Sequence, residues 1–148
     1  MKDNKIAEPL EVLNLIMRKE FALEIVQGKK KVEFRAYSEH FSSRLYDKDV
    51  LNFMQLHKNE PDVLDECDPL RAVRTIHFHN YENSWFLDVE CILNDVVAVT
   101  DEDVAYLNKE YDCHELDEQL QTLKSTGEDN RPMYFYFVIG KILRTNLS

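Results

Sequence analysis

The chain has 148 residues and carries 18 basic against 28 acidic side chains, for a formal net charge of −10. This length suits one domain over residues 1–148, and an apolar content of 44% is ordinary for a folded protein rather than a disordered one. The negative charge argues against long duplex DNA as a partner. Only three glycines are present, so the sequence contains neither a glycine-rich phosphate-binding loop nor a dinucleotide-binding fingerprint. This excludes kinase-type and Rossmann-type enzymes.

Nothing in the chain predicts a membrane segment or a secretory signal. No apolar run approaches the ~20 residues that a helix needs to cross a bilayer. Residues 1–9 are polar, unlike a signal peptide. We therefore expect no membrane partner and a cytoplasmic location. Cys67, Cys91 and Cys113 are odd in number and lack C-x-x-C spacing, which favours reduced thiols.

The first third of the chain predicts a strand, a helix and a second strand. Five of the six residues in 12–17 are apolar, as in a buried strand. An apolar helical face follows over 19–27, built from Phe21, Ala22, Ile25 and Val26. Gly28 then suits the left-handed position that ends a helix. From residue 31 to about 37 the pattern alternates, with Val32 and Phe34 on a core face and charged residues on the other.

The middle of the chain is less regular. We expect residues 38–58 to be mostly helical because their apolar positions fit helical spacing in pieces. Residues 60–68 contain five acids and Pro61, which predicts a solvated loop. This loop is not expected to link two domains, because neither side holds enough strands for its own core.

The second half predicts a hairpin, two helices and a last strand. Residues 71–80 and 85–91 alternate as two antiparallel strands around a turn at 81–83. The inward positions are Ile76, Phe78, Trp85, Leu87, Val89 and Cys91. The apolar pattern continues to Thr100 with a break at 94–95.

Thr100 can cap a helix whose first turn holds acids, which the helix dipole favours. A second helix is expected over 114–124, with Leu116, Leu120 and Leu123 inward. Residues 133–143 are apolar on both faces, as in a central or closing strand.

Positive charge is concentrated around the predicted helix end at Gly28. Residues 18–35 hold six bases and three acids, a net +3, so the rest of the chain carries −13. A single nucleotide or a short RNA end can meet such a local positive pocket, whereas long duplex DNA is repelled by the remaining surface. The alternative is an ordinary solvated lysine turn.

Gly28, Lys30, Glu33 and Arg35 spell G-x-K-x-x-E-x-R, which resembles the signature of the ASCH domain family, a relative of PUA domains. The preceding strand and helix match in order, and residues 38–70 have no counterpart. The resemblance implies an α+β fold with a small, PUA-like mixed or antiparallel β-barrel and flanking helices. It also implies binding of RNA, nucleotides or modified nucleosides, without a cofactor.

The candidate ligand-binding residues are Lys30, Glu33, Arg35, Arg18 and Lys19. Glu33 and Arg35 share a strand face, so they can pair with each other or clamp a polar ligand. Lys30 is an odd number of residues from Glu33 and Arg35, so in a regular strand its side chain would point to the opposite face. It joins them only if the turn after Gly28 rotates it. The alternative is an ion-paired strand that fixes the helix–strand junction.

The resemblance also offers an enzymatic alternative. One bacterial ASCH branch comprises amidohydrolases that deacetylate N4-acetylcytidine with a lysine, a threonine three residues later and a glutamate. Lys30 matches the lysine, Glu33 occupies the threonine position, and Glu110 matches the glutamate loosely; these are the catalytic candidates if the chain is a hydrolase. A third alternative is a protein-interaction module that uses the acidic helices over 101–118.

Two further groups of side chains bear on the site. His77 and His79 share a strand face, and Cys113 and His114 are further candidate metal ligands. No third ligand is fixed by the sequence, so we expect no metal. Four aromatic residues on predicted strands are candidates for stacking on a base, although such residues more often belong to the core: Trp85, Phe86, Tyr134 and Tyr136.

Overall fold

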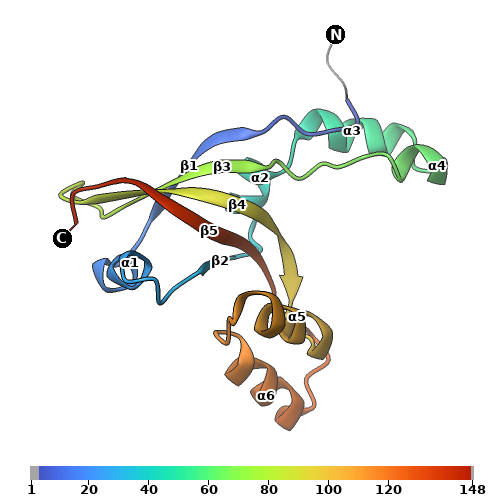
Figure 1. The fold of residues 1–148 in the computed structure, drawn as a ribbon. Coiled ribbons are helices and arrows are strands. Elements are labelled where there is room, and N and C mark those ends of the chain that lie inside the picture. Colours follow the sequence, from blue (N-terminus) through green and yellow to red (C-terminus); the bar gives the residue numbers. More distant parts are fainter. Residues whose placement is uncertain (1–3, 148) are drawn as a thin grey trace.

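A five-stranded mixed sheet with flanking helices organises the computed structural model, which describes residues 4–147 (Figure 1). Its strands are β1 (Leu10–Ile16), β2 (Val32–Ala36), β3 (Val73–His79), β4 (Phe86–Ala98) and β5 (Met133–Thr145). The helices of the described part are α1 (Lys19–Val26), α2 (Glu39–Leu45), α3 (Lys48–Leu56), α4 (Pro61–Leu64), α5 (Asp101–Tyr111) and α6 (Asp117–Thr126). The expected α+β class is confirmed.

The sheet is open. Its strand order is β1-β3-β4-β5-β2, with β1 parallel to β3 and the other neighbours antiparallel, so β1 and β2 form the two edges. Across residues 4–147 no strand pairing joins these edges, and the predicted closed barrel is therefore not confirmed. A side-chain hydrogen bond links the two edge strands, because Arg35 Nη2 of β2 donates to the carbonyl of Ile16 in β1 at 3.0 Å.

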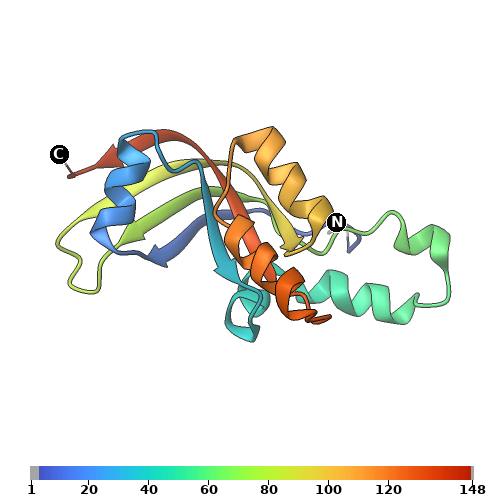
Figure 2. The ribbon, with the colours of Figure 1, turned by 90° about the horizontal axis from the view of Figure 1, so that it is seen from below.

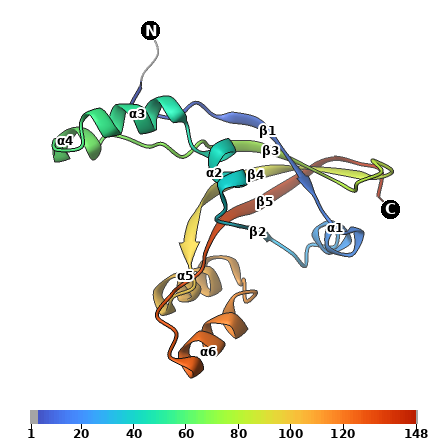
Figure 3. The same cartoon turned by 180° about the vertical axis from the view of Figure 1, so that it is seen from behind.

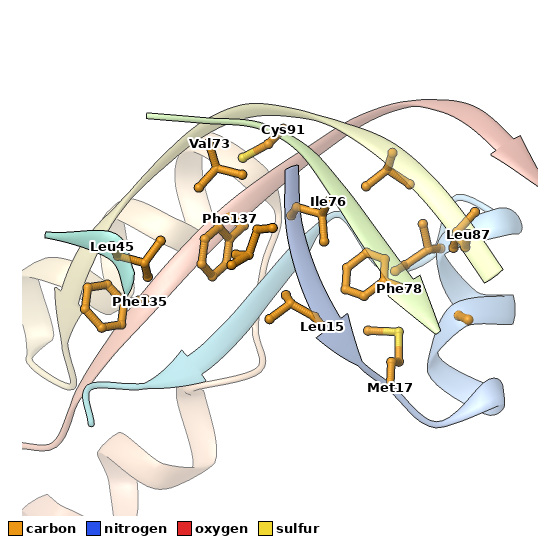
Figure 4. Close-up of a cluster of buried hydrophobic side chains, with 14 of the residues drawn as sticks. Leu15, Met17, Leu45, Val73, Ile76, Phe78, Leu87, Cys91, Phe135 and Phe137 are labelled. Carbon is orange, nitrogen blue, oxygen red and sulfur yellow. The ribbon is translucent and has the colours of Figure 1, made fainter. Parts of the chain in front are cut away.

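The larger core lies on the face of the sheet that α1 and α2 cover, which we call the inner face. Figure 4 shows Phe135 and Phe137 of β5 beside Leu45 of α2, with side chains of β1 and β3 next to them. Both phenylalanines are buried. Seen from behind, α2 lies close to the middle of the sheet (Figure 3). The inward residues predicted for the β3–β4 hairpin, Ile76, Phe78, Trp85, Leu87, Val89 and Cys91, all belong to this core.

A second core lies on the other face of β2, β4 and β5, under α5 and α6. Val32 and Tyr136 pack there against Leu107, Leu116 and Leu120 of the helical region. The predicted cap is present, because Thr100 Oγ1 accepts a hydrogen bond from the backbone N–H of Asp103 at 3.2 Å. As a result β2 is covered on both faces and lies between α1 and the α5–α6 pair (Figure 2).

Residues 38–58 are helical, as expected, in two pieces. The first, α2, is capped by Ser38, whose hydroxyl accepts from the N–H of Phe41 at 3.4 Å. The second, α3, begins after Asp47, whose carboxylate accepts from the N–H of Asp49 at 2.9 Å. Two short polar side chains therefore set where these helices start.

One local expectation is wrong. Residues 60–68 are not a plain loop, since α4 begins at Pro61, whose fixed φ and missing N–H suit the first turn of a helix.

β4 continues through the polar residues at 94–95 that interrupt its apolar pattern. Asn94 is tolerated in the strand because its side chain takes part in backbone pairing: it accepts from the N–H of Val73 at 2.9 Å and donates to the carbonyl of Arg71 at 3.0 Å.

None of the helices within residues 4–147 has the length and apolar character needed to span a membrane. Cys67, Cys91 and Cys113 are free thiols. Burial raises the pKa of Cys91 to about 12, so this thiol stays protonated at neutral pH.

Candidate functional site

The end of α1 turns the chain sharply and positions Lys30. Gly28 has a φ of +77°, the left-handed conformation predicted for it. Its N–H donates to Ile25 at 3.0 Å, and the N–H groups of Lys29 and Lys30 donate to Glu24 at 2.9 and 3.2 Å. These bonds satisfy carbonyls that the helix end leaves open. The turn thereby rotates the Lys30 side chain toward β2, so that it lies on the same side as Glu33 although strand alternation would place the two on opposite faces.

Four charged side chains form a continuous ion chain. Lys30 Nζ lies 2.7 Å from Glu115 Oε1 and 3.4 Å from Glu33 Oε1. Glu33 Oε2 in turn lies 2.9 Å from Arg35 Nη2. The structure thus brings together Lys30, Glu33 and Arg35, and it adds Glu115 as a fourth member. We call this group, Glu115-Lys30-Glu33-Arg35, the ion chain.

The middle of the ion chain is buried. The exposed fraction is 8% for the Lys30 side chain, 9% for Glu33, 20% for Arg35 and 45% for Glu115. Glu33 pairs with Phe137 in the β2–β5 register, so its carboxylate faces the inner core. Burying charges is tolerated only when they are paired, and each inner charge here has a partner on either side.

The same environment fixes the charge state of Lys30. Burial is the largest influence and on its own lowers the pKa of this ammonium group. Glu33 and Glu115 together outweigh burial, and the pKa of Lys30 is raised above its usual 10.5. Lys30 is therefore a firmly held cation at neutral pH rather than a free base.

A cavity of about 350 Å³ opens beside Lys30, between residues 28–32 and residues 111–115 of the α5–α6 connection. We call it the turn pocket. Lys29, Lys30 and Lys31 line one side, and Tyr111 and Glu115 line the other. It combines three lysines, the tyrosine ring and two carboxylates, Asp112 and Glu115, of which Asp112 is paired with His114. Cations, aromatic rings and carboxylates are groups that contact phosphates, bases and polar ring substituents.

His114, also in the lining, is biased toward its protonated form. Its Nε2 lies 2.9 Å from Asp112 Oδ1 and its Nδ1 lies 3.0 Å from Asp117 Oδ2. These two hydrogen bonds, that of Asp112 first, raise the pKa of His114. The neighbouring Cys113 is different, because burial raises the pKa of its thiol and so favours the protonated form.

A second cavity, of about 310 Å³, lies at the open side of the sheet. Its lining comes from the end of β1, from Arg35 of β2, from α2 and from His79 of β3. We call it the edge pocket. Arg35 belongs both to the ion chain and to this pocket, so the ion chain reaches from one cavity to the other.

The remaining predicted site residues lie elsewhere. Arg18 is exposed and 3.4 Å from Glu20, and Lys19 is exposed at the start of α1. Glu110 is exposed on α5. None of the three lines either pocket. The acid that lines the turn pocket and contacts Lys30 is Glu115 instead of Glu110. The usable signal was the acidic connection over 112–118, whose charge complements the lysine turn.

The candidate stacking residues are not in the turn pocket either. Trp85 and Tyr136 belong to the two cores, and Tyr134 donates its hydroxyl to Gln119 at 3.0 Å. The ring of Phe86 stacks on His77 with centroids 6.0 Å apart. The aromatic residue that does line this pocket is Tyr111, which sequence reasoning did not single out.

The histidine pair of β3 shares a face, as predicted, with ring centroids 5.3 Å apart. His77 Nδ1 pairs with the carboxylate of Asp88, and His79 Nδ1 lies 2.9 Å from the carbonyl of Asn80. Within residues 4–147, no group of three or more potential metal ligands is gathered at one point.

Neither protein-family models nor curated proteins match this sequence.

Proposed function

We propose that this chain binds a nucleotide, a modified nucleoside or the end of a short RNA in the turn pocket, as an ASCH-like protein whose open sheet is a variant of the PUA-like barrel. One observation carries the proposal: three consecutive lysines and an aromatic residue line a cavity of about 350 Å³ on a chain of net charge −10. Ligand cavities commonly span ~300–1,000 Å³, so a mononucleotide suits this one.

The three lysines have different tasks in this proposal. Lys29 and Lys31 are exposed and make no ion pair with the described residues, so their ammonium groups are free for phosphate oxygens. Lys30 is held by Glu33 and Glu115, and one of its three N–H donors remains for a ligand. The cation closest to the core thus fixes the ligand's position, while the outer two attract it.

Glu115 and Tyr111 recognise the nucleoside part. The carboxylate of Glu115 is 45% exposed and can accept a hydrogen bond from an exocyclic amino group or a ribose hydroxyl. The ring of Tyr111 offers a surface for a base, a contact worth ~1–3 kcal/mol per base. A cytosine or adenine nucleotide therefore fits better than uracil, which has no amino group.

The test compares cytidine, cytidine monophosphate, N4-acetylcytidine and a six-nucleotide RNA by calorimetry and melting temperature. The monophosphate should bind more tightly than cytidine, and Lys29→Gln/Lys31→Gln should remove this advantage. The matched control is Lys48→Gln/Lys58→Gln, which loses the same charge at exposed positions outside the turn pocket. With two phosphate contacts, RNA affinity should fall about sevenfold between 50 and 200 mM salt.

Two results would overturn the proposal. One is the absence of any melting shift for all four ligands in the wild-type protein; the other is equal binding by the two lysine double variants. Product chromatography on the same samples tests the amidohydrolase alternative. Cytidine and acetate appearing from N4-acetylcytidine, and disappearing in Lys30→Ala, would replace simple binding by hydrolysis.

A further inference from the structure

The edge pocket has an unusual lining for so acidic a chain. Arg35, His40, Arg44 and His79 contribute guanidinium and imidazole groups, and no acidic residue lines the cavity. The rest of the lining is Asn14, Leu15, Ile16 and Phe41. Basic side chains of an acidic protein usually pair with its many carboxylates, so a cavity whose only ionisable lining groups are basic favours an anion from outside.

Arg35 is held in place by two hydrogen bonds and still has N–H donors that are not used. Within residues 4–147 the Arg35 side chain donates two hydrogen bonds, to Glu33 and to the carbonyl of Ile16, and both come from Nη2. A guanidinium carries five N–H donors, so the three on Nη1 and Nε have no partner among residues 4–147. Glu33 and Ile16 therefore hold the guanidinium plane in place while its free edge remains able to bind an oxyanion.

Arg44 and His40 approach the cavity from α2. They are four residues apart on one helix face, and both line the edge pocket. The half-buried Arg44 side chain makes no hydrogen bond or ion pair with the described residues, although the chain is rich in carboxylates. The ring of His40 packs edge-on against Phe41, with centroids 4.9 Å apart. Because the Arg44 guanidinium has no protein partner among the described residues, its N–H donors remain available to an anionic ligand.

His79 completes the polar lining. A carbonyl only accepts hydrogen bonds, so the 2.9 Å contact with Asn80 requires His79 Nδ1 to carry a proton. Nε2 is then the nitrogen left for a ligand, and it donates to an oxyanion when the ring is protonated. Phe41, Leu15 and Ile16 add apolar surface beside these groups, which a bare inorganic ion would not use.

We propose that the edge pocket binds a small organic oxyanion, a phosphate or carboxylate carried on an apolar or aromatic group. Arg35 and Arg44 hold the anionic oxygens and Phe41 contacts the organic part. The site is separate from the turn pocket and does not depend on what binds there. Phosphate and carboxylate groups both have two or more oxygens that can accept paired hydrogen bonds from a guanidinium, and the experiment distinguishes them.

The test is a titration of ¹⁵N-labelled protein with phenyl phosphate, benzoate, inorganic phosphate and benzylamine, followed by amide chemical shifts. Saturable shifts are expected over residues 14–16 and 40–45 with phenyl phosphate or benzoate, the stronger of the two identifying the oxyanion. Inorganic phosphate should bind more weakly, and benzylamine should not bind. Arg44→Gln should weaken binding about tenfold or more, with Arg44→Lys between it and the wild type.

Arg74→Gln is the matched control, because Arg74 is an exposed arginine paired with Glu11 outside the edge pocket. It should bind the probes as the wild type does, and so should Lys29→Gln/Lys31→Gln. Well-dispersed amide spectra establish that each variant is folded. The proposal is overturned if no saturable shifts occur in the two segments. It is also overturned if benzylamine binds as well as benzoate, if inorganic phosphate binds as tightly as phenyl phosphate, or if Arg44→Gln and Arg74→Gln weaken binding equally.

Discussion

Replacing Glu33 by glutamine should destabilise the protein far more than its single lost charge implies. Glu33 is the inner acid of the ion chain, and its two oxygens serve Lys30 at 3.4 Å and Arg35 at 2.9 Å. Glutamine keeps the shape of the side chain and removes the charge. Two cations with exposed fractions of 8% and 20% then share a neutral amide.

The magnitude follows from what each cation retains. Breaking a fully buried ion pair typically costs ~3–5 kcal/mol. Lys30 keeps Glu115 at 2.7 Å and Arg35 keeps the carbonyl of Ile16 at 3.0 Å, so neither cation is left alone. We therefore expect Glu33→Gln to lower the free energy of unfolding by about 2 kcal/mol, below the range for an isolated pair.

Urea denaturation measures this loss directly. With a slope of ~2 kcal/mol per molar urea, the transition midpoint should fall by about 1 M. Glu110→Gln is the matched control, because Glu110 is an exposed acid on α5, and its change should stay within ~0.5 kcal/mol. A midpoint for Glu33→Gln that is indistinguishable from that of Glu110→Gln would refute the reasoning that the ion chain supports the fold.

Two further changes test the flanks of the turn pocket. Gly28→Ala should lower the free energy of unfolding, measured in urea, by about 1 kcal/mol, because φ is +77° at this residue. The added Cβ meets no atom within 4 Å, so the loss comes from backbone strain alone. An unchanged stability would contradict this strain argument. The NMR titration of His114 should have its midpoint above the ordinary 6.5, and Asp112→Asn should lower it. Because the folded pKa is raised, the stabilisation from His114 is complete below pH 6.5 and is lost as pH rises through the folded value. A midpoint at or below 6.5 in the wild-type protein would show that the two carboxylates do not hold the proton.

Local patterns in the sequence predicted most elements but not how they come together. The left-handed Gly28 and the Thr100 cap depend on neighbouring residues, and both predictions are confirmed. Val32 and Phe34 share one core, as their alternation predicted, but Glu33 on the opposite face is buried as well. The short helix at Pro61 was missed because an acidic, proline-containing stretch fits a loop as well as a first helical turn.

The site was harder to predict because its partners come from distant parts of the chain. Lys30 and Glu115 are 85 residues apart, and only the packing of α5 and α6 against β2 brings them within 2.7 Å. The edge pocket draws His40 and Arg44 from a segment that matched no family pattern. Charge complementarity between the lysine turn and the acidic connection was visible in the sequence, but the particular partner of Lys30 was not.

The placement of β2 at the edge next to β5 also constrains the order in which the protein can fold. Val32 pairs with Val138, so the strand holding Glu33 and Arg35 has no neighbour in the sheet until β5 has been synthesised. During translation α1 and the lysine turn emerge early, yet their charged side chains must stay hydrated until the last strand arrives. Such a long-range pairing slows folding, because a large loop must close before the contact contributes any stability. A nascent chain halted before Met133 should therefore lack both the completed sheet and the ion chain.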